Sequence, residues 1–186
     1  MNKELLKNEE KEKYEYMWKQ DLYRENSPAF HRFFDSVKSV IDRGDSIIEF
    51  GCGTGVGLAE LGKTHDVTGV DIAKNCLSEG VNIPFVEACL WDPINLTADV
   101  GFCVDVMEHI PTERVSATFR EIMKCVPKCL FIVCKQLDSN SRNNTGPKLH
   151  LTVKKDNWWI NEASKYGKVK VLKTDGVRIQ FIIQKQ

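Results

Sequence analysis

Five short, nearly continuous apolar runs limit most strongly what this chain can fold into. They span Ile47–Phe50, Val67–Asp71, Pro84–Leu90, Val100–Val106 and Cys129–Lys135. Helical patterns, at 56–61 and again at 115–123, separate some of these runs. An alternating strand keeps one face in water, whereas a continuous apolar strand is buried on both faces. The pattern therefore predicts an α/β fold in which helices cover both faces of a parallel sheet.

The end of the chain has a different pattern. A helix expected around 156–166 precedes two β-rich runs, Val169–Leu172 and Val177–Ile183, joined through Thr174-Asp175-Gly176. An Asp-Gly pair between such runs is typical of a β-hairpin, so the last strand should run antiparallel. We therefore expect a three-layer α/β sandwich, with a doubly wound, mostly parallel seven-stranded sheet and an antiparallel last strand.

Two amphipathic helices are expected before the first strand. Residues 3–25 are highly charged, but large apolar side chains recur at helical spacing: Tyr14, Met17, Trp18 and Leu22. A second helix should begin at Ser27-Pro28 and end at Gly44. We expect residues 1–44 to form N-terminal helices that cover the site, and residues 45–186 to form the core of a single domain.

Composition and charge narrow the class of protein. The 186 residues include 26 basic and 26 acidic side chains, and this balance disfavours a nucleic acid as the main partner. No apolar run is long enough to span a bilayer, so we expect no membrane insertion. The charged start, MNKELLKNEEKEK, lacks the apolar core of a signal peptide. The seven cysteines form no C-x-x-C pair, which indicates reduced, mostly buried thiols in a cytoplasmic protein.

A glycine-rich turn follows the first apolar run, in the segment SIIEFGCGTGVGLAEL. Gly51, Gly53 and Gly55 lack a Cβ atom, so the backbone there can turn sharply and approach a ligand closely. The dinucleotide fingerprint G-x-G-x-x-G would require a glycine at position 56, where this chain has Val56. The turn therefore indicates a nucleotide-like ligand other than a dinucleotide.

Two acids beside this turn indicate the kind of ligand. Glu49, just before the turn, is poorly placed beside a pyrophosphate and well placed to accept from an ammonium group. Asp71, at the end of the second run, can accept both hydroxyls of a ribose. A ligand with a ribose and an ammonium group but no phosphate fits S-adenosylmethionine and does not fit NAD.

These motifs resemble those of the seven-stranded, Rossmann-like (class I) S-adenosylmethionine-dependent methyltransferases, in the group that includes small-molecule methyltransferases. IIEFGCGTGVGLAEL matches the first motif of that family, VTGVDIA the second, EACLWD the third, and DVGFCVDVMEHIP the motif after the fourth strand. The resemblance covers residues 14–184, and the terminal hairpin matches the reversed seventh strand of that fold. It implies an enzyme that uses S-adenosylmethionine as its methyl donor.

The resemblance also implies which residues bind the cofactor. The methionine part would be held by Glu49 and by the backbone from Gly51 to Gly55, which includes Cys52 and Gly53. The ribose would be bound by Asp71, and the adenine would lie against Ile72, Cys89, Leu90 and Trp91. The sulfonium would lie above Asp105 to Glu108. Tyr23 is the N-terminal aromatic residue that we expect to reach the site. The third and fourth runs are too close for a helix between them, so Trp91 and Asp92-Pro93 are expected to fold over the adenine.

Methyl transfer needs a group that aligns the acceptor and removes its proton, because the sulfonium already activates the methyl group. His109 is the candidate base, since an unperturbed imidazole titrates near neutrality. Glu108 would orient His109 or contact the acceptor. The alternative is that His109 is a structural residue bonded to a loop. His150 is a third catalytic candidate, or it lines the substrate pocket or satisfies a loop carbonyl.

A metal site is a further option at the same residues. Asp105, Glu108, His109 and His150 form a set of two carboxylates and two imidazoles. Certain small-RNA and ubiquinone-pathway O-methyltransferases carry a similar E-x-x-E-H with a distant histidine, and bind a divalent ion near the acceptor hydroxyl. Mg2+ or Mn2+ would lower the pKa of that hydroxyl. The first carboxylate here is one methylene shorter, and we prefer the interpretation without a metal.

The acceptor is constrained mainly by motifs that the chain lacks. DVME after the fourth run is not the Asn/Asp-Pro-Pro-aromatic motif of DNA amino methylation, and no Pro-Cys pair is present for cytosine C5 methylation. We expect a small or pendant acceptor, with a hydroxyl favoured by the histidine and acid cluster. Two alternatives stay open: a non-catalytic, cofactor-binding partner subunit, and a nicotinamide-dependent oxidoreductase. The identity of the acceptor and the oligomeric state are also open.

One long polar stretch, Gln136–Lys148, interrupts the alternating pattern. Its composition predicts a mobile surface loop. Asn143, Asn144 and Gly146 within it are expected to form a lid over the acceptor.

Overall fold

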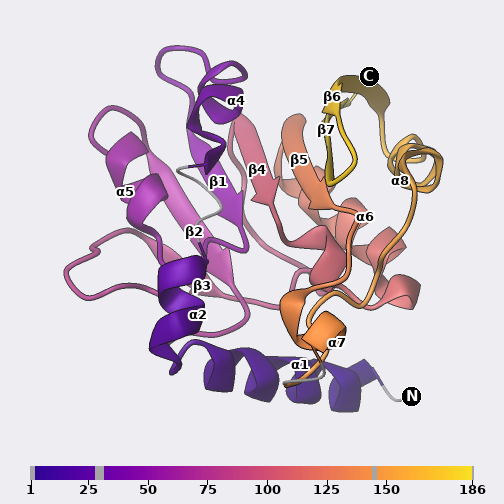
Figure 1. The fold of residues 1–186 in the computed structure, drawn as a ribbon. Helices are drawn as coiled ribbons and strands as arrows, with labels where there is room; N and C mark the ends of the chain where they lie inside the picture. The colour runs from indigo at the N-terminus through magenta and orange to yellow at the C-terminus, as the bar shows by residue number, and fades with distance from the viewer. Residues whose placement is uncertain (1–2, 28–31, 144–145, 186) are drawn as a thin grey trace.

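Seven strands form one sheet, in the order β3-β2-β1-β4-β5-β7-β6, in the computed structural model of residues 3–27, 32–143 and 146–185 (Figure 1). The strands are β1 (Ile47–Phe50), β2 (Val67–Asp71), β3 (Phe85–Glu87), β4 (Val100–Val104), β5 (Lys128–Cys134), β6 (Lys168–Thr174) and β7 (Arg178–Gln184). The helices are α1 (Lys3–Met17), α2 (Asp21–Asn26), α4 (Phe34–Lys38), α5 (Val56–Leu61), α6 (Val115–Cys125), α7 (Ser139–Asn143) and α8 (Asp156–Ala163). Two single 3-10 turns, η1 (Met107–His109) and η2 (Thr112–Arg114), follow β4.

The directions of the strands confirm the predicted fold class. β3, β2, β1, β4 and β5 are parallel, whereas β7 is antiparallel to both β5 and β6. The β6–β7 turn is closed by Asp175, whose Oδ1 accepts hydrogen bonds from the amides of Val177 and Arg178, both at 2.7 Å. Because five strands are parallel, their carboxyl ends lie on the same edge of the sheet, where ligands bind in open α/β sheets.

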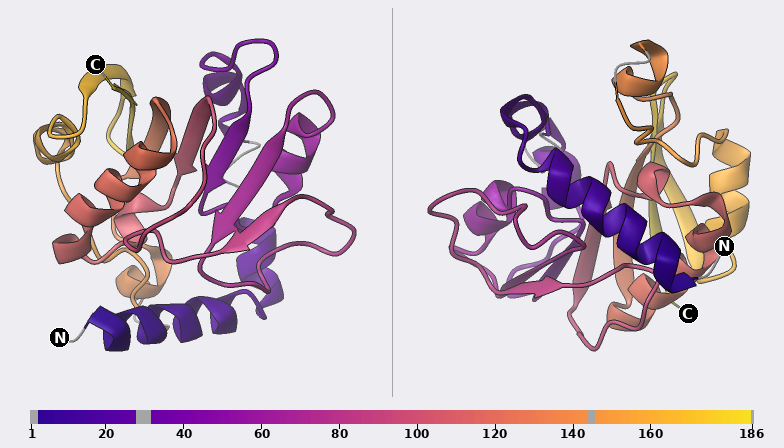
Figure 2. Two further views of the ribbon diagram at one scale, coloured as in Figure 1. Left: turned by 180° about the vertical axis from the view of Figure 1, so that it is seen from behind. Right: turned by 90° about the horizontal axis from the view of Figure 1, so that it is seen from below.

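Helices cover both faces of the sheet, which forms the middle of three layers (Figure 2). On one face, α4 and α5 pack against side chains such as Phe102 and Ile132. On the other face, α6 and α8 pack against residues such as Phe131 and Phe181. Neighbouring residues of β5, Phe131 and Ile132, therefore belong to opposite layers, as the two-residue period of a strand requires. Both layers exclude water, which explains the continuous apolar runs of β1, β2, β4 and β5. The third run was also expected to be a buried strand, but β3 lies at the edge of the sheet and is only partly buried.

The N-terminal region differs from the expectation of two helices over 3–25 and 27–44. The first of these is divided into α1 and α2, because Gln20 adopts an extended backbone conformation (φ −92°, ψ 118°). The break turns Leu22 outward, and its side chain is 73% exposed. Of the second helix, α4 is described, and Pro28 lies outside the described residues. This helix ends at Lys38 and not at the predicted Gly44, which lies in a later turn with φ +89°.

Two connections bear on the site. Residues 88–99, between β3 and β4, contain no helix, as predicted, although β3 ends at Glu87 and not at the predicted Leu90. The polar segment 136–148 contains the short helix α7, and Asn144 lies outside the described residues. The lid role expected for this segment stays a prediction.

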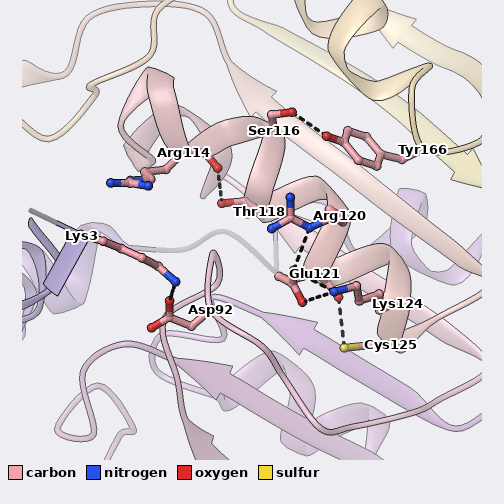
Figure 3. Close-up of polar contacts among 10 residues, drawn as sticks. All are labelled: Lys3, Asp92, Arg114, Ser116, Thr118, Arg120, Glu121, Lys124, Cys125 and Tyr166. Atoms are coloured by element: carbon pink, nitrogen blue, oxygen red, sulfur yellow. Dashed lines mark hydrogen bonds and ion pairs between the residues drawn. The ribbon is translucent and has the colours of Figure 1, made fainter.

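Helix α1 crosses the carboxyl edge of the sheet (Figures 1 and 2). It is joined to the segment that follows β3, where Lys3 and Lys7 form ion pairs with Asp92 at 2.5 and 2.8 Å. Figure 3 shows the Lys3–Asp92 pair, together with the bond between Ser116 of α6 and Tyr166 after α8, whose hydroxyls are 2.5 Å apart. Polar contacts thus join α1 to the segment after β3, and α6 to the segment after α8.

All seven cysteines are buried with free thiols, as the sequence predicts. Among the described helices, none combines the length and the apolar character that crossing a membrane requires.

Candidate cofactor and acceptor site

A cavity at the carboxyl edge of β1, β2 and β4 brings together most of the predicted site residues. Twelve of them line it: Tyr23, Glu49, Gly51, Cys52, Gly53, Asp71, Ile72, Cys89, Leu90, Trp91, Asp105 and His109. Gly55, Glu108 and His150 do not line it. The parallel sheet explains this assembly, because residues that follow different parallel strands meet at one edge.

The glycine turn forms one wall of the cavity. Its three glycines all have positive φ, at +78° for Gly51, +50° for Gly53 and +69° for Gly55. A Cβ atom at Gly51 would overlap the Val106 side chain, and one at Gly53 would lie 3.0 Å from the Trp18 ring. Gly55 is the N-cap residue of α5, outside the cavity. The glycines are therefore needed both for the backbone conformation and for close packing.

Two buried carboxyl groups face the cavity from β1 and β2. Glu49 is 3% exposed, and its Oε2 has no hydrogen-bond partner among the described residues. Burial, and then the charge of Asp71, raise the pKa of Glu49 to about 8. Asp71 accepts from the Ala73 and Gly53 amides at 3.0 and 3.1 Å, yet burial raises its pKa to about 6. Few hydrogen bonds and no cationic side chain of the described residues offset the burial of these two carboxyl groups. They therefore suit a ligand that brings a positive charge and hydroxyl donors.

Trp91 supplies a second unpaired polar atom in this cavity. Its side chain is 3% exposed, and its indole Nε1 lacks a hydrogen-bond partner in the described structure. Buried polar atoms normally have partners, so this donor and Glu49 Oε2 fit a bound polar ligand. The residues present thus fit S-adenosylmethionine.

Asp105, directly after β4, is engaged by an arginine from β7. Arg178 donates from Nε to Oδ1 at 2.9 Å and from Nη2 to Oδ2 at 3.0 Å. Asp105 also has φ +51°, the left-handed conformation that a residue with a Cβ atom rarely adopts. This two-bond pair fixes the carboxylate at the cavity wall, and it raises the pKa of Arg178.

His109 is joined to the N-terminal helix inside the cavity. Its Nδ1 lies 2.8 Å from the hydroxyl of Tyr14 on α1, which also lines the cavity. Burial, and then the neighbouring His150, lower the pKa of His109 to about 3, so the imidazole is neutral. Burial raises the pKa of Tyr14 well above its usual value. The phenol therefore keeps its proton, and it donates to Nδ1 in the imidazole tautomer that carries its proton on Nε2.

Glu108 and His150 lie behind His109. The Glu108 side chain is fully buried, and its Oε1 accepts from the Cys134 amide of β5 at 3.1 Å. Burial, and then the charge of Asp105, raise the pKa of Glu108 well above its usual value. The His150 ring packs edge-on to His109 with centroids 4.8 Å apart, and its Nδ1 donates to the Gln136 carbonyl at 2.6 Å. Direct roles of these two residues in catalysis stay predictions.

The metal option of the sequence is met only in part by this geometry. Glu108, His109 and His150 offer ligand atoms within 4.8 Å of one another, but Asp105 is not in this group. Its carboxylate binds Arg178, while Glu108, His109 and His150 bond through one atom each to Cys134, Tyr14 and Gln136, and Oε2 of Glu108 has no hydrogen-bond partner among the described residues. We derive no step through a metal ion.

Several cavity residues were not predicted from the sequence. They are Glu10, Ser27, Gly57, Val104 and Ile110. Tyr14 and Trp18 also line the cavity, although their helical spacing favoured a role in the core. In the sequence, Tyr14 is recognisable only as part of an amphipathic helix. That pattern does not reveal its partner His109, which is 95 residues away.

Comparison with known families agrees with this geometry. A family model described as a methyltransferase domain matches residues 17–174. The chain belongs to this family. It is an S-adenosylmethionine-dependent methyltransferase, and this membership decides against the nicotinamide-dependent oxidoreductase. Comparison with the sequences of curated proteins gives no match.

Solved structures share the fold at low sequence identity. A Pyrococcus horikoshii OT3 protein is 13% identical, with a TM-score of 0.70 over 91% of this chain and 93% of that one. The magnesium protoporphyrin IX methyltransferase of Synechocystis PCC 6803 is 16% identical, with a TM-score of 0.62 over 90% of this chain and 88% of that one. An O-methyltransferase family protein from Burkholderia thailandensis is 14% identical, with a TM-score of 0.69 over 90% of this chain and 61% of that one.

Proposed function

We propose that this methyltransferase methylates a hydroxyl group of a small or pendant acceptor, and that Tyr14 and His109 receive the proton of that hydroxyl. The observation that carries the proposal is the 2.8 Å hydrogen bond between Tyr14 and His109 at the wall of the cofactor cavity. This bond joins His109, which can take up a proton, to the Tyr14 hydroxyl, which can reach the molecule that is methylated.

The acids and the glycine turn would hold the cofactor. Glu49 would accept from the ammonium group, Asp71 would bind the ribose hydroxyls, and Trp91 would lie beside the adenine. Bound S-adenosylmethionine supplies a methyl group on a positively charged sulfur, which needs no further activation. The protein is left with two tasks: to align the acceptor oxygen and to take its proton.

Tyr14 and His109 together can take that proton. In the His109 tautomer with its proton on Nε2, the Tyr14 hydroxyl donates to Nδ1, and the phenolic oxygen keeps a lone pair that can accept from the substrate hydroxyl. As the acceptor oxygen forms its bond to the methyl carbon, its proton passes to the Tyr14 oxygen. The proton of Tyr14 passes at the same time to Nδ1. His109 becomes an imidazolium and takes up the positive charge that the transfer releases.

A base as weak as His109 is sufficient for this step. An oxygen that has gained a methyl group while keeping its proton is a far stronger acid than a free hydroxyl, so the transfer to imidazole is downhill. Because the pKa of His109 is about 3, its protonation state does not change around neutral pH. We therefore expect a turnover rate that shows no imidazole titration between about pH 5 and 8.

Glu108 and His150 act in this proposal as positioning residues. Glu108 attaches η1 to β5 through the Cys134 amide, and His150 supports the ring of His109 from the side. The hydroxyl acceptor draws further support from the O-methyltransferase family name of the Burkholderia protein with the same fold.

The test is methyl transfer from labelled S-adenosylmethionine to a panel of small alcohols, phenols, amines and carboxylates. Tyr14→Phe should lower kcat about a hundredfold, the scale of general acid–base catalysis, and leave the dissociation constant of S-adenosylhomocysteine within about twofold. Tyr16→Phe is the matched control, because Tyr16 lies on the same helix with 57% of its side chain exposed. Full activity of Tyr14→Phe would contradict the proton path. Cofactor binding with no transfer to any acceptor would favour the non-catalytic partner subunit.

A further inference from the structure

The break between α1 and α2 places two aromatic rings against the cofactor cavity. Trp18 and Tyr23 both line it, and their rings meet edge-on with centroids 4.9 Å apart. The Trp18 ring also lies against the glycine turn, since a Cβ atom at Gly53 would be only 3.0 Å from it. We call residues 18–24 the elbow. Its position decides how far this side of the cavity is closed.

Arg24 attaches the elbow to the loop that follows β2. Its Nε donates to the Trp18 carbonyl at 2.6 Å, and its Nη1 donates to the Cys76 carbonyl at 3.0 Å and the Leu77 carbonyl at 3.4 Å. Nη2 donates to the Asn75 carbonyl. The guanidinium also lies 5.7 Å from the centre of the Trp18 ring. One side chain therefore joins the elbow to three consecutive residues of the loop.

The same loop is attached to the glycine turn. The Ser78 amide donates to the Thr54 carbonyl at 3.0 Å, and the Leu77 side chain fills the space beside Gly55. On its other side, Asn75 donates from Nδ2 to the Glu15 carbonyl of α1 at 2.9 Å. The elbow, the loop and the glycine turn thus form a closed ring of contacts beside Asp71, and Arg24 is the side chain that closes it.

Helix α1 also contacts the core through the Tyr14–His109 and Asn75–Glu15 hydrogen bonds, whereas its lysine ion pairs are weaker in kind. Lys3 and Lys7 pair with Asp92, and Lys11 pairs with Glu87, but the lysine side chains are 32–45% exposed. Ion pairs in water contribute little, because solvent screens them and long side chains lose freedom. Arg24 instead bonds partly buried carbonyl groups. Its loss should therefore loosen the elbow more than the loss of any one lysine.

We propose that Arg24 is a positioning residue for the cofactor: it holds Trp18 and Tyr23 over the cavity and so sets the rate at which the cofactor product leaves. Arg24 does not itself line the cavity, so it acts through the two rings and the loop. The proposal concerns the cofactor and is independent of the acceptor and of the Tyr14–His109 proton path. Lysine cannot replace arginine here, because one ammonium group cannot reach carbonyls in the separate directions served by Nε, Nη1 and Nη2.

The test is the dissociation rate of S-adenosylhomocysteine, measured by stopped-flow tryptophan fluorescence, because Trp18 and Trp91 line the cavity. S-adenosylhomocysteine should dissociate roughly tenfold faster from the Arg24→Ala variant, equivalent to about 1.4 kcal/mol. The Arg24→Lys variant should restore the slow dissociation only in part. Arg43→Ala is the matched control, because Arg43 is exposed. An unchanged rate in Arg24→Ala, with a native circular dichroism spectrum, would overturn the proposal. So would full recovery in Arg24→Lys.

Hydrogen exchange of the unmodified protein gives a second test that does not depend on the folding of a variant. Adding S-adenosylhomocysteine should slow exchange in 18–26 and in 75–78 together, because Arg24 joins these segments. Protection of 75–78 without protection of the elbow would show that the two segments move independently, and would refute the proposal. Neither measurement needs an acceptor, so a failure of the proposed hydroxyl methylation leaves both outcomes interpretable.

Discussion

Comparing Gly51 with Gly80 separates two reasons why replacing a glycine by alanine lowers stability: backbone strain and steric clash. Both residues have φ +78°. A Cβ atom at Gly80 would meet nothing within 4 Å, whereas one at Gly51 would overlap Cγ2 of Val106 and lie 3.0 Å from its Cγ1. Gly80→Ala therefore adds only backbone strain, while Gly51→Ala adds the same strain and a steric clash at the cavity.

The two costs can be estimated from these contacts. A left-handed backbone costs a residue with a Cβ atom about 1–2 kcal/mol, which is the expected loss for Gly80→Ala. Crowding in a packed site adds about 1–3 kcal/mol, so Gly51→Ala should lose about 2–5 kcal/mol of unfolding free energy. For a chain of this size each kilocalorie lowers the Tm by about 2–4 °C.

Urea unfolding of the ligand-free protein measures both losses on the same scale. In the Val106→Ala background, the cost of Gly51→Ala should fall toward that of Gly80→Ala, because truncation removes both Cγ atoms and leaves the Cβ of residue 106, at 3.3 Å, as the nearest atom. Equal losses for the two single variants would refute the steric argument. An undiminished loss in the Val106→Ala background would show that the crowding comes from another group.

Two further predictions concern buried carboxyl groups. The contribution of Glu49 to the stability of the ligand-free protein should fall as the pH rises from about 4.5 to about 8, because the unfolded chain releases the Glu49 proton near 4.5 while the folded chain holds it to about 8. Below about 6.5 the lowered pKa of His109 contributes in the opposite direction, so the decline should be clearest from about 6.5 to about 8. Glu49→Gln should flatten this decline in urea unfolding across that range, and an unchanged slope would refute the assigned pKa. Glu108→Gln should keep methyl transfer and lose less than about 1 kcal/mol, because the amide oxygen can still accept from Cys134, whereas Glu108→Ala leaves that amide unpaired and should cost about 1–3 kcal/mol. Loss of activity in a folded Glu108→Gln protein would favour a direct catalytic role instead.

The sequence was sufficient for the features that depend on neighbours in the chain. β1 and β2 have the predicted bounds, because each is a continuous apolar run that ends at a turn. The glycine turn and its acids could be assigned for the same reason. The parallel order of the strands then brought Glu49, Asp71 and Asp105 to one edge, since residues after parallel strands meet there.

Only the tertiary structure decided which of the site's side chains are bonded to other residues and what their charge states are. Asp105 is bonded to Arg178, 73 residues away, and His109 is bonded to Tyr14, 95 residues away. Neither pairing leaves a periodic or compositional signal in the chain. The pKa of His109 also lies well below that of a free histidine, because burial and then the nearby His150 lower it. Local sequence patterns determine strands and turns through short-range sterics, whereas charge states and long-range partners arise only when distant segments pack and exclude water.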